Sequence, residues 1–193
     1  MTRPISLPYD GHIRYVRCFE SSSCQKIYQA LFEQILWQPD QITLFGKTIT
    51  TRRLVAWYGE QPFSYTYSKN TKTAMSYTPL LRKLQDQVSE AAGTSFNSCL
   101  LNFYPDGNTG MGWHSDDEPE LQLQATIASL SFGAARSFKF RHRKTGETIS
   151  LLLESGSLLL MEGCTQEHWL HQLPVSKKVT APRINLTFRT MRT

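Results

Sequence analysis

Apolar side chains recur at helical spacing in two segments of the chain. Over residues 21–37 they recur every four residues, behind a run of serines that offers N-caps and ahead of Pro39, which ends a helix. A second helix is announced by Thr78 and Pro79, because proline at the first helical position loses no hydrogen bond, and Gly93 marks its end. We expect both helices to buttress a sheet.

From residue 98 onward the apolar positions form short runs or alternate with polar ones. Alternation places successive side chains on opposite faces of a sheet, and turn residues separate the runs. The expected strands are a short one at 13–19, followed by 98–104, 126–132, 137–142, 148–153, 157–161, 169–173 and 184–189. Short strands that follow two helices predict an α+β, mainly β fold built as an antiparallel sandwich or jelly roll.

The composition fits one soluble domain. A chain of 193 residues is long enough to bury a core, and we expect residues 1–193 to form a single domain and a monomer. The net charge of +5 and the pI near 9.1 favour a polyanionic partner without naming it. The four cysteines form no Cys-x-x-Cys pair, and neither a signal peptide nor an apolar run of about 18 residues is present. We therefore expect an intracellular protein without a membrane partner, cytoplasmic in a bacterium or nuclear in a eukaryote.

A candidate metal site lies around His114. His114 and Asp116 stand at i, i+2, so on an extended backbone both side chains point the same way. His171, further along the chain, offers a third ligand. Two imidazoles and one carboxylate form a facial triad. Such a triad leaves three positions of an octahedral ion open, which suits non-haem Fe(II) that binds a co-substrate and dioxygen together.

The closing segment indicates the co-substrate. If residues 184–189 form a strand, the apolar Ile184, Leu186 and Phe188 share one face. The opposite face then carries a polar row, made of Arg183, Asn185, Thr187 and Arg189. Two guanidiniums in one row can grip a dicarboxylate by paired charge-assisted hydrogen bonds, which fits 2-oxoglutarate.

The remaining histidines are weaker candidates. His12 lies in an irregular opening segment, His142 lies in a basic hairpin, and His168 precedes His171 by three residues, where strand alternation turns it away from the site. Each is more often a surface or structural residue, although His168 can orient the site through a ligand. A zinc hydrolase is disfavoured, because the chain has no His-Glu-x-x-His and the arginine row would have no role.

Taken together, His114-x-Asp116, His171 and Arg183-x-Asn185-x-x-x-Arg189 resemble the AlkB family of Fe(II)/2-oxoglutarate dioxygenases. Other stretches match the same family, in particular a member that repairs duplex DNA: Asn102-x-Tyr104 with Asp106-Gly107, residues 127–133 and residues 177–183. The resemblance covers roughly residues 40–190. It implies a double-stranded β-helix (jelly roll) over about 98–190, a nucleotide-recognition lid over about 40–77, and Fe(II), 2-oxoglutarate and O2 as cofactors.

The resemblance also implies how the co-substrate is held. Asn102 and Tyr104 become co-substrate ligands beside the row from Arg183 to Arg189. Tyr104 and Arg183 would bind the distal carboxylate, and Arg189 would lie nearer the keto acid and the iron. Without the family, Asn102 and Tyr104 are equally well interpreted as polar residues at the edge of the core.

For the substrate, the resemblance assigns the aromatic, basic and glycine-punctuated stretch from 44 to 68 to base recognition. Phe45 matches a wedge that enters the duplex beside a flipped base, and packing in the core is the alternative. Tyr65 and Tyr67 match an aromatic clamp on that base. Tyr67 stands where the relative has phenylalanine, so its hydroxyl needs a partner.

Acidic and basic groups complete the expected interface. Asp117 and Glu118 would lie at the base, because a carboxylate suits a base made cationic by methylation of a ring nitrogen. The expected phosphate contacts are Arg53, Arg143, Lys144, Lys177 and Lys178. The alternative for both sets is an ordinary solvated turn. The relative has a longer loop at the hairpin of Lys144, so individual phosphate contacts carry over poorly.

The implied activity is oxidative DNA dealkylation repair. Methyl groups on base ring nitrogens, those of 1-methyladenine and 3-methylcytosine first, would leave as formaldehyde while 2-oxoglutarate becomes succinate and CO2. Double-stranded DNA is the expected partner rather than single-stranded DNA. Two alternatives remain open. A same-fold oxygenase acting on RNA or protein should lack the Phe45 wedge and the base clamp, and a non-catalytic nucleic-acid-binding module should have lost a metal ligand.

Overall fold

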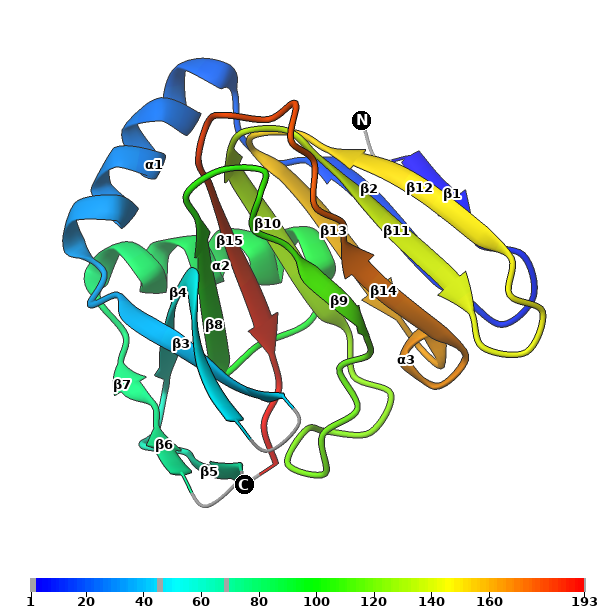
Figure 1. Ribbon diagram of the computed structural model, residues 1–193, viewed down its shortest axis with the longest axis horizontal. Coiled ribbons are helices and arrows are strands. Elements are labelled where there is room, and N and C mark those ends of the chain that lie inside the picture. The colour runs from blue at the N-terminus through cyan, green and yellow to red at the C-terminus, as the bar shows by residue number, and fades with distance from the viewer. Residues whose placement is uncertain (1–2, 45–46, 68–69, 193) are drawn as a thin grey trace.

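A computed structural model describes residues 3–44, 47–67 and 70–192 (Figure 1). In this part of the chain a larger and a smaller β-sheet face each other, and two helices cover the outer face of the larger sheet (Figure 1). Phe45 lies outside the described residues, as do the side chains of Tyr65 and Tyr67. None of the described helices is long and apolar enough to cross a membrane.

The strands of the described chain fall into three sheets. The larger sheet has the order β1 (Arg3–Ser6), β2 (His12–Arg17), β13 (Ser157–Glu162), β10 (Ile127–Gly133), β15 (Arg183–Arg189), β8 (Ser98–Tyr104), β4 (Lys47–Gly59) and β3 (Gln38–Leu44), and β7 (Met75–Ser76) pairs with β4. The smaller sheet has the order β12 (Thr148–Leu153), β11 (Arg136–His142), β14 (Trp169–Leu173) and β9 (Met111–His114). A separate pair is formed by β5 (Ser64–Tyr67) and β6 (Asn70–Thr73).

The described helices are α1 (Ser21–Gln34), α2 (Pro79–Ala92) and the short α3 (Thr165–His168). α2 has the expected ends. The hydroxyl of Thr78 accepts a hydrogen bond from the Leu81 N–H at 3.2 Å, and Gly93 adopts the left-handed backbone, with φ of 74°, that closes a helix.

α1 differs from expectation at both ends. Its N-cap is Glu20, which makes no side-chain cap bond, so the serines lie in the first turn instead of capping it. The helix ends at Gln34 and not near residue 37, because Ile35 is extended with ψ of 135°. Pro39 does not end the helix but lies inside β3. Proline holds the residue before it in an extended conformation, so a strand begins there directly.

Two apolar clusters hold the three layers together. The first joins the helices to the larger sheet and includes Leu31, Leu81, Leu84, Val88, Leu101, Leu130, Phe132, Leu186 and Phe188. The second lies between the two sheets and includes Tyr104, Phe138, Phe140, Met161, Trp169 and Leu173. Alternation on β15 therefore sends Leu186 and Phe188 toward the helices and leaves the polar row facing the smaller sheet, as predicted.

The first half of the chain contains more sheet than its sequence predicts. Beyond residue 98, each predicted strand lies within one residue of the bounds observed. The residues of the expected lid form most of β3 and the thirteen-residue β4, which pairs with β8 and so extends the larger sheet. The sequence of β4 shows no clear alternation of apolar and polar residues, because it is rich in threonine and arginine. Its pairing with β3 also shifts register between Pro39 and Gln41. The opening segment, expected to be irregular, forms β1.

Candidate active site

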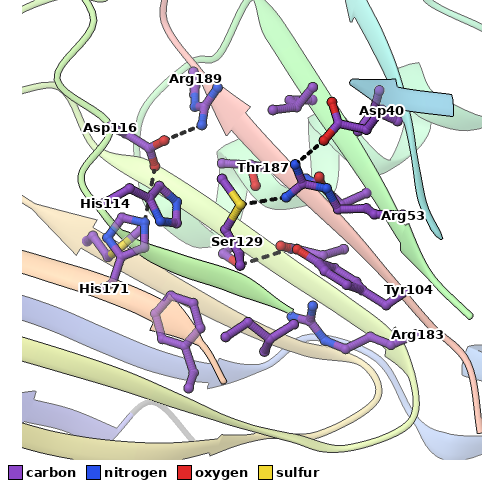
Figure 2. Close-up of a pocket in the computed structure, with 18 of the residues that line it drawn as sticks. Asp40, Arg53, Tyr104, His114, Asp116, Ser129, His171, Arg183, Thr187 and Arg189 are labelled. Carbon is purple, nitrogen blue, oxygen red and sulfur yellow. Dashed lines mark hydrogen bonds and ion pairs between the residues drawn. The ribbon is translucent and has the colours of Figure 1, made fainter. Parts of the chain in front are cut away.

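The predicted metal and co-substrate residues meet in one cavity between the two sheets (Figure 2). The cavity has a volume of about 180 Å³. The smaller sheet and the segment after β9 supply His114, Asp116 and His171, and β8 supplies Asn102 and Tyr104. β15 supplies the whole polar row, namely Arg183, Asn185, Thr187 and Arg189. Segments far apart in sequence thus bring together every residue assigned to the metal and the co-substrate.

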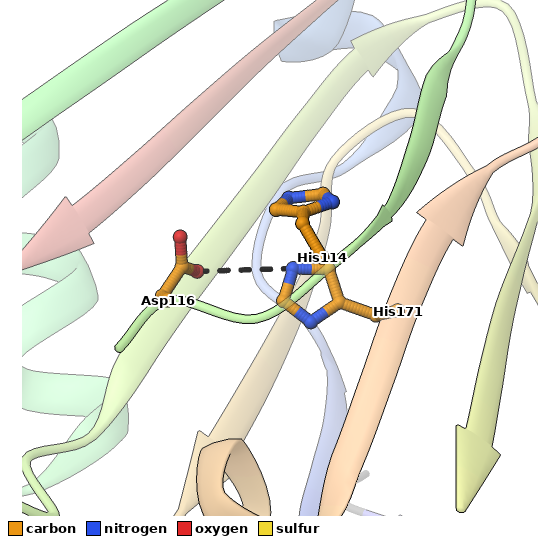
Figure 3. A group of neighbouring side chains, drawn as sticks. All are labelled: His114, Asp116 and His171. Carbon is orange, nitrogen blue, oxygen red and sulfur yellow. Dashed lines mark ion pairs between the residues drawn. The ribbon is translucent and has the colours of Figure 1, made fainter. Parts of the chain in front are cut away.

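The three metal-ligand candidates form a compact cluster (Figure 3). His114 on β9 and His171 on β14 are paired across the strands, with ring centroids 4.2 Å apart. Ligand atoms of these two histidines and Asp116 all lie within 4.8 Å of one another. One detail differs from expectation, because β9 ends at His114 and Asp116 lies beyond the strand. The carboxylate reaches the site from a loop and not through strand alternation.

The protonation states of the cluster suit a metal ion. Burial lowers the pKa of His171 to about 3, so its imidazole is neutral and its lone pair is available. Although burial opposes it, the charge of the neighbouring Arg189 guanidinium lowers the pKa of Asp116, which keeps it ionised. The Nδ1–H of His114 donates to the carbonyl of Gly112 at 2.8 Å, which leaves Nε2 free to bind. The donor set therefore fits Fe(II) held by a facial triad.

Arg183 and Arg189 occupy different parts of the cavity. Arg189 forms an ion pair with Asp116, so it lies beside the metal-ligand candidates. Arg183 donates to the hydroxyl of Ser131 at 2.9 Å and lies 5.5 Å from the ring centre of Tyr104. Burial lowers the pKa of Arg183 to about 10, so it remains cationic near neutral pH. Its buried Nε has no partner among the described residues, which suits a carboxylate ligand.

The neighbouring polar residues are fixed by the fold. Asn102, Asn185 and Thr187 are each buried and line the cavity. The amide of Asn185 donates to the hydroxyl of Ser129 at 3.0 Å and to the carbonyl of Leu130 at 3.0 Å. These bonds tie β15 to β10 and hold the polar row in place.

The two acidic substrate candidates lie in different surroundings. Glu118 lines the cavity, burial raises its pKa, and its Oε2 is buried without a hydrogen-bond partner in the described structure. Asp117 is exposed. It accepts from the Ser115 hydroxyl at 2.8 Å and pairs with Arg143 at 3.2 Å. The structure thus brings Glu118, and not Asp117, into the cavity.

The basic candidates do not form one patch. Arg143 and Lys144 are exposed in the turn between β11 and β12, and the Arg143 N–H donates to the carbonyl of His168 just before β14. Lys177 and Lys178 are exposed in the loop that follows the other end of β14. A phosphate backbone would have to span β14 to contact both groups.

Arg53 is not a surface residue. Its side chain is 9% exposed and forms an ion pair with Asp40, which is buried to the same extent (Figure 2). Both residues line the cavity, and Arg53 also contacts the sulfur of Met111. In this arrangement the Arg53 guanidinium is not available to a phosphate. The exposed neighbour is Arg52, which pairs with Asp106 at 2.9 Å.

The other histidines lie outside the cavity. His142 is buried, with its Nδ1 3.0 Å from the Thr145 hydroxyl and its ring against Trp169. The alternation assumed for His168 does not apply, because His168 ends α3 and β14 begins after it. Sequence reasoning missed Gln166 in the same helix, whose Oε1 accepts from the Asp116 N–H at 2.9 Å. No spacing rule signals such a contact between a side chain and a distant backbone.

Comparisons with known proteins agree with this geometry. The family model of the 2OG-Fe(II) oxygenase superfamily matches residues 13–189. The chain is 40% identical over 186 residues to the Mus musculus protein named DNA oxidative demethylase ALKBH2. The match covers 91% of this chain and 78% of that protein. It is 41% identical over 177 residues to the Homo sapiens alpha-ketoglutarate-dependent dioxygenase alkB homolog 3. This match covers 86% of this chain and 60% of that protein.

A solved structure, that of OsALKBH1, has the same fold. It matches with a TM-score of 0.65 and 16% identity, and the match covers 97% of this chain and 100% of that chain. The fold, the ligand cluster and the family match all agree. The chain therefore belongs to the 2OG-Fe(II) oxygenase superfamily and, within it, to the AlkB family.

Proposed function

We propose that this protein repairs DNA by oxidative removal of small alkyl groups from base ring nitrogens, with 1-methyladenine and 3-methylcytosine as the preferred lesions. The observation that carries this proposal is the carboxylate of Glu118. It lines the same cavity as the metal ligands and has a buried oxygen without a partner among the described residues. A base methylated at such a nitrogen is cationic and can supply the missing partner. The names of the relatives, DNA oxidative demethylases among them, support DNA as the nucleic acid.

In this proposal, different residues of the cavity bind the metal and the co-substrate. His114, Asp116 and His171 would hold Fe(II), while Arg183 and Tyr104 would bind the distal carboxylate of 2-oxoglutarate. When bound, the iron and 2-oxoglutarate supply the oxidation of the methyl carbon by dioxygen, with succinate, CO2 and formaldehyde as products. Arg189 holds the Asp116 carboxylate in place, and the enclosing sheets exclude water.

We propose double-stranded DNA as the preferred form of the substrate. A base in a duplex must be flipped out before it can enter a cavity between two sheets, at a cost of roughly a few kcal/mol that is least for a damaged pair. Phe45, which follows β3 in the sequence, is the residue we assign to fill the gap left in the stack, and Tyr65 and Tyr67 on β5 are those we assign to the base. A protein substrate would give these aromatic residues no comparable role.

The experiment that tests this function compares substrates in parallel. The protein is incubated with Fe(II), 2-oxoglutarate and ascorbate and with the same 3-methylcytosine sequence as duplex DNA, single-stranded DNA and RNA. Mass spectrometry then follows the loss of one CH2 unit. We expect the fastest loss from duplex DNA. Faster loss from RNA would refute DNA as the substrate, and faster loss from single-stranded DNA would refute the duplex preference alone.

A further inference from the structure

Of the three metal-ligand candidates, Asp116 is the one that does not lie on a strand. β9 ends at His114, and Asp116 lies in the segment that follows it. Its side chain is nonetheless buried. A ligand on a loop needs other contacts to fix its position before the metal arrives, because groups around the ligands normally set their orientation. The described structure offers two such contacts.

Arg189 holds the carboxylate of Asp116, and Gln166 holds its backbone. The Oε1 atom of Gln166 accepts a hydrogen bond from the Asp116 N–H at 2.9 Å. On its other side, the Nε2 atom faces the sulfur of Met161 at 3.4 Å, a weak acceptor. A reversed amide would set an N–H donor against the Asp116 N–H, so the hydrogen-bond pattern fixes the orientation of the amide.

Gln166 stands on a firmly anchored turn. The preceding residue, Thr165, is buried, and its hydroxyl donates to the carbonyl of Glu162 at 2.6 Å and accepts from the His12 N–H at 2.9 Å. These bonds tie α3 to β13 and β2. Because α3 leads directly into β14, the strand that carries His171, Gln166 links the loop of one metal ligand to the strand of another (Figure 1).

We propose that Gln166 is a positioning residue of the metal site, which sets Asp116 at the correct distance from His171 before the ion binds. It touches neither the metal nor the substrate and acts through the Asp116 backbone. The proposal rests on the metal triad and does not depend on which nucleic acid is the substrate.

The test measures metal binding to the full chain without nucleic acid. Mn(II), which is redox-stable, is titrated into metal-free wild type, Gln166→Leu and Gln166→Glu. Leucine fills a similar volume without an acceptor, whereas glutamate keeps an oxygen that can accept from Asp116 N–H. We expect Gln166→Leu to weaken Mn(II) binding by about 10- to 100-fold, the usual effect of losing a group that orients a ligand. Gln166→Glu should stay close to wild type.

A neighbouring contact provides a matched control. Gln124 donates to Glu167 at 2.9 Å and joins the same loop to the same helix at an exposed position. Glu167→Ala should therefore leave Mn(II) affinity unchanged. Equal losses in Glu167→Ala and Gln166→Leu, or a lower melting temperature of Gln166→Leu with unchanged affinity, would show that Gln166 only tethers the loop and would overturn the proposal.

Two further outcomes are distinguishable. If Gln166→Leu does not fold, Gln166→Asn serves in its place, because its amide is one methylene too short to reach Asp116 and should weaken Mn(II) binding in the same way. If wild type binds Mn(II) more tightly than the variant but repairs no methylated DNA, the proposed function fails and the positioning role of Gln166 stands.

Discussion

Adjacent residues of the same charge lie in very different surroundings in this protein. Arg52 is 64% exposed and pairs with Asp106, whereas Arg53 is 9% exposed and pairs with Asp40 inside the cavity. The same contrast separates exposed Asp117 from Glu118, which has a buried oxygen without a partner among the described residues. Burial, and not charge alone, therefore decides which of these side chains can meet a phosphate and which can meet a ligand in the cavity.

Arg183→Lys should raise the apparent KM for 2-oxoglutarate much more than the apparent KM for DNA. A lysine ammonium is a point charge and cannot replace the two parallel donors of a guanidinium, and the buried Arg183 leaves no room for DNA contact. Steady-state kinetics with each substrate varied in turn measures both constants. A change confined to DNA would remove Arg183 from the co-substrate site.

The buried imidazole of His171 should make the metal-free protein sensitive to mild acid. The pKa of His171 is about 3 in the folded state, against 6.5 for an ordinary histidine. Below pH 6.5 the unfolded chain binds a proton that the folded chain does not, so stability is greatest above pH 6.5 and falls as the pH falls toward 3. Urea unfolding between about pH 7 and 5 measures this loss.

The comparison for this pH dependence is a pair of variants. His171→Asn should lose less stability than wild type over the same pH range, because the proton uptake on unfolding is gone. His12→Asn, which changes an exposed side chain, should keep the wild-type pH dependence. The assignment of a neutral buried His171 would be wrong if all three proteins lost stability equally.

At the scale of elements, the sequence predicts the strands of the second half of the chain well and those of the first half poorly. β8, β10 and β15 are flanked by turns and bury apolar side chains against the helices, so their pattern is readable. The hydrophobic pattern does not predict β3 and β4, because their polar residues include Arg53 and Asp40, which are buried as a pair. Residue type and spacing predict Asp116 as a ligand, although the loop that carries it is held by Gln166 and not by strand pairing.

The turn between β11 and β12 should carry part of the phosphate contact, and Arg53 on β4 should not. Replacing Arg143 and Lys144 by glutamine should lower the log-log slope of duplex affinity against salt by about 0.9 for each phosphate that these side chains neutralise. Arg53→Met should leave the slope unchanged, because Arg53 is buried against Asp40. Binding titrations at several salt concentrations measure these slopes. A smaller slope in Arg53→Met would mean that the pair opens on DNA.

Phe45, which lies between β3 and β4 in the sequence, should distinguish duplex repair from single-strand repair. If Phe45 is the wedge, Phe45→Ala should slow repair of methylated duplex by roughly tenfold or more, since base–aromatic stacking is worth roughly 1–3 kcal/mol. A single-stranded substrate has no stack to refill and should be repaired at the wild-type rate. Equal losses on both substrates together with a lower melting temperature would identify Phe45 as a core residue.

At the scale of the whole molecule, the layers explain why the site lies where it does. Helices cover one face of the larger sheet, so the polar alternate positions of β8, β10 and β15 face inward toward the smaller sheet (Figure 1). The smaller sheet closes the cavity and carries His114 and His171. Local patterns predict each strand but not which strands become neighbours. The order β10-β15-β8 brings together segments that are distant in sequence. Only the family resemblance, which implies a jelly roll, indicated such pairing.

The most direct test of the whole account is a count of products from one methylated DNA duplex under limiting 2-oxoglutarate. For every methyl group removed, we predict one formaldehyde and one succinate, with no removal when 2-oxoglutarate is omitted or when His171 is replaced by alanine. The three products are measured in the same reaction by mass spectrometry. Demethylation that continues without 2-oxoglutarate or in His171→Ala, or succinate formed by wild type while the methyl groups remain on the DNA, would contradict the account.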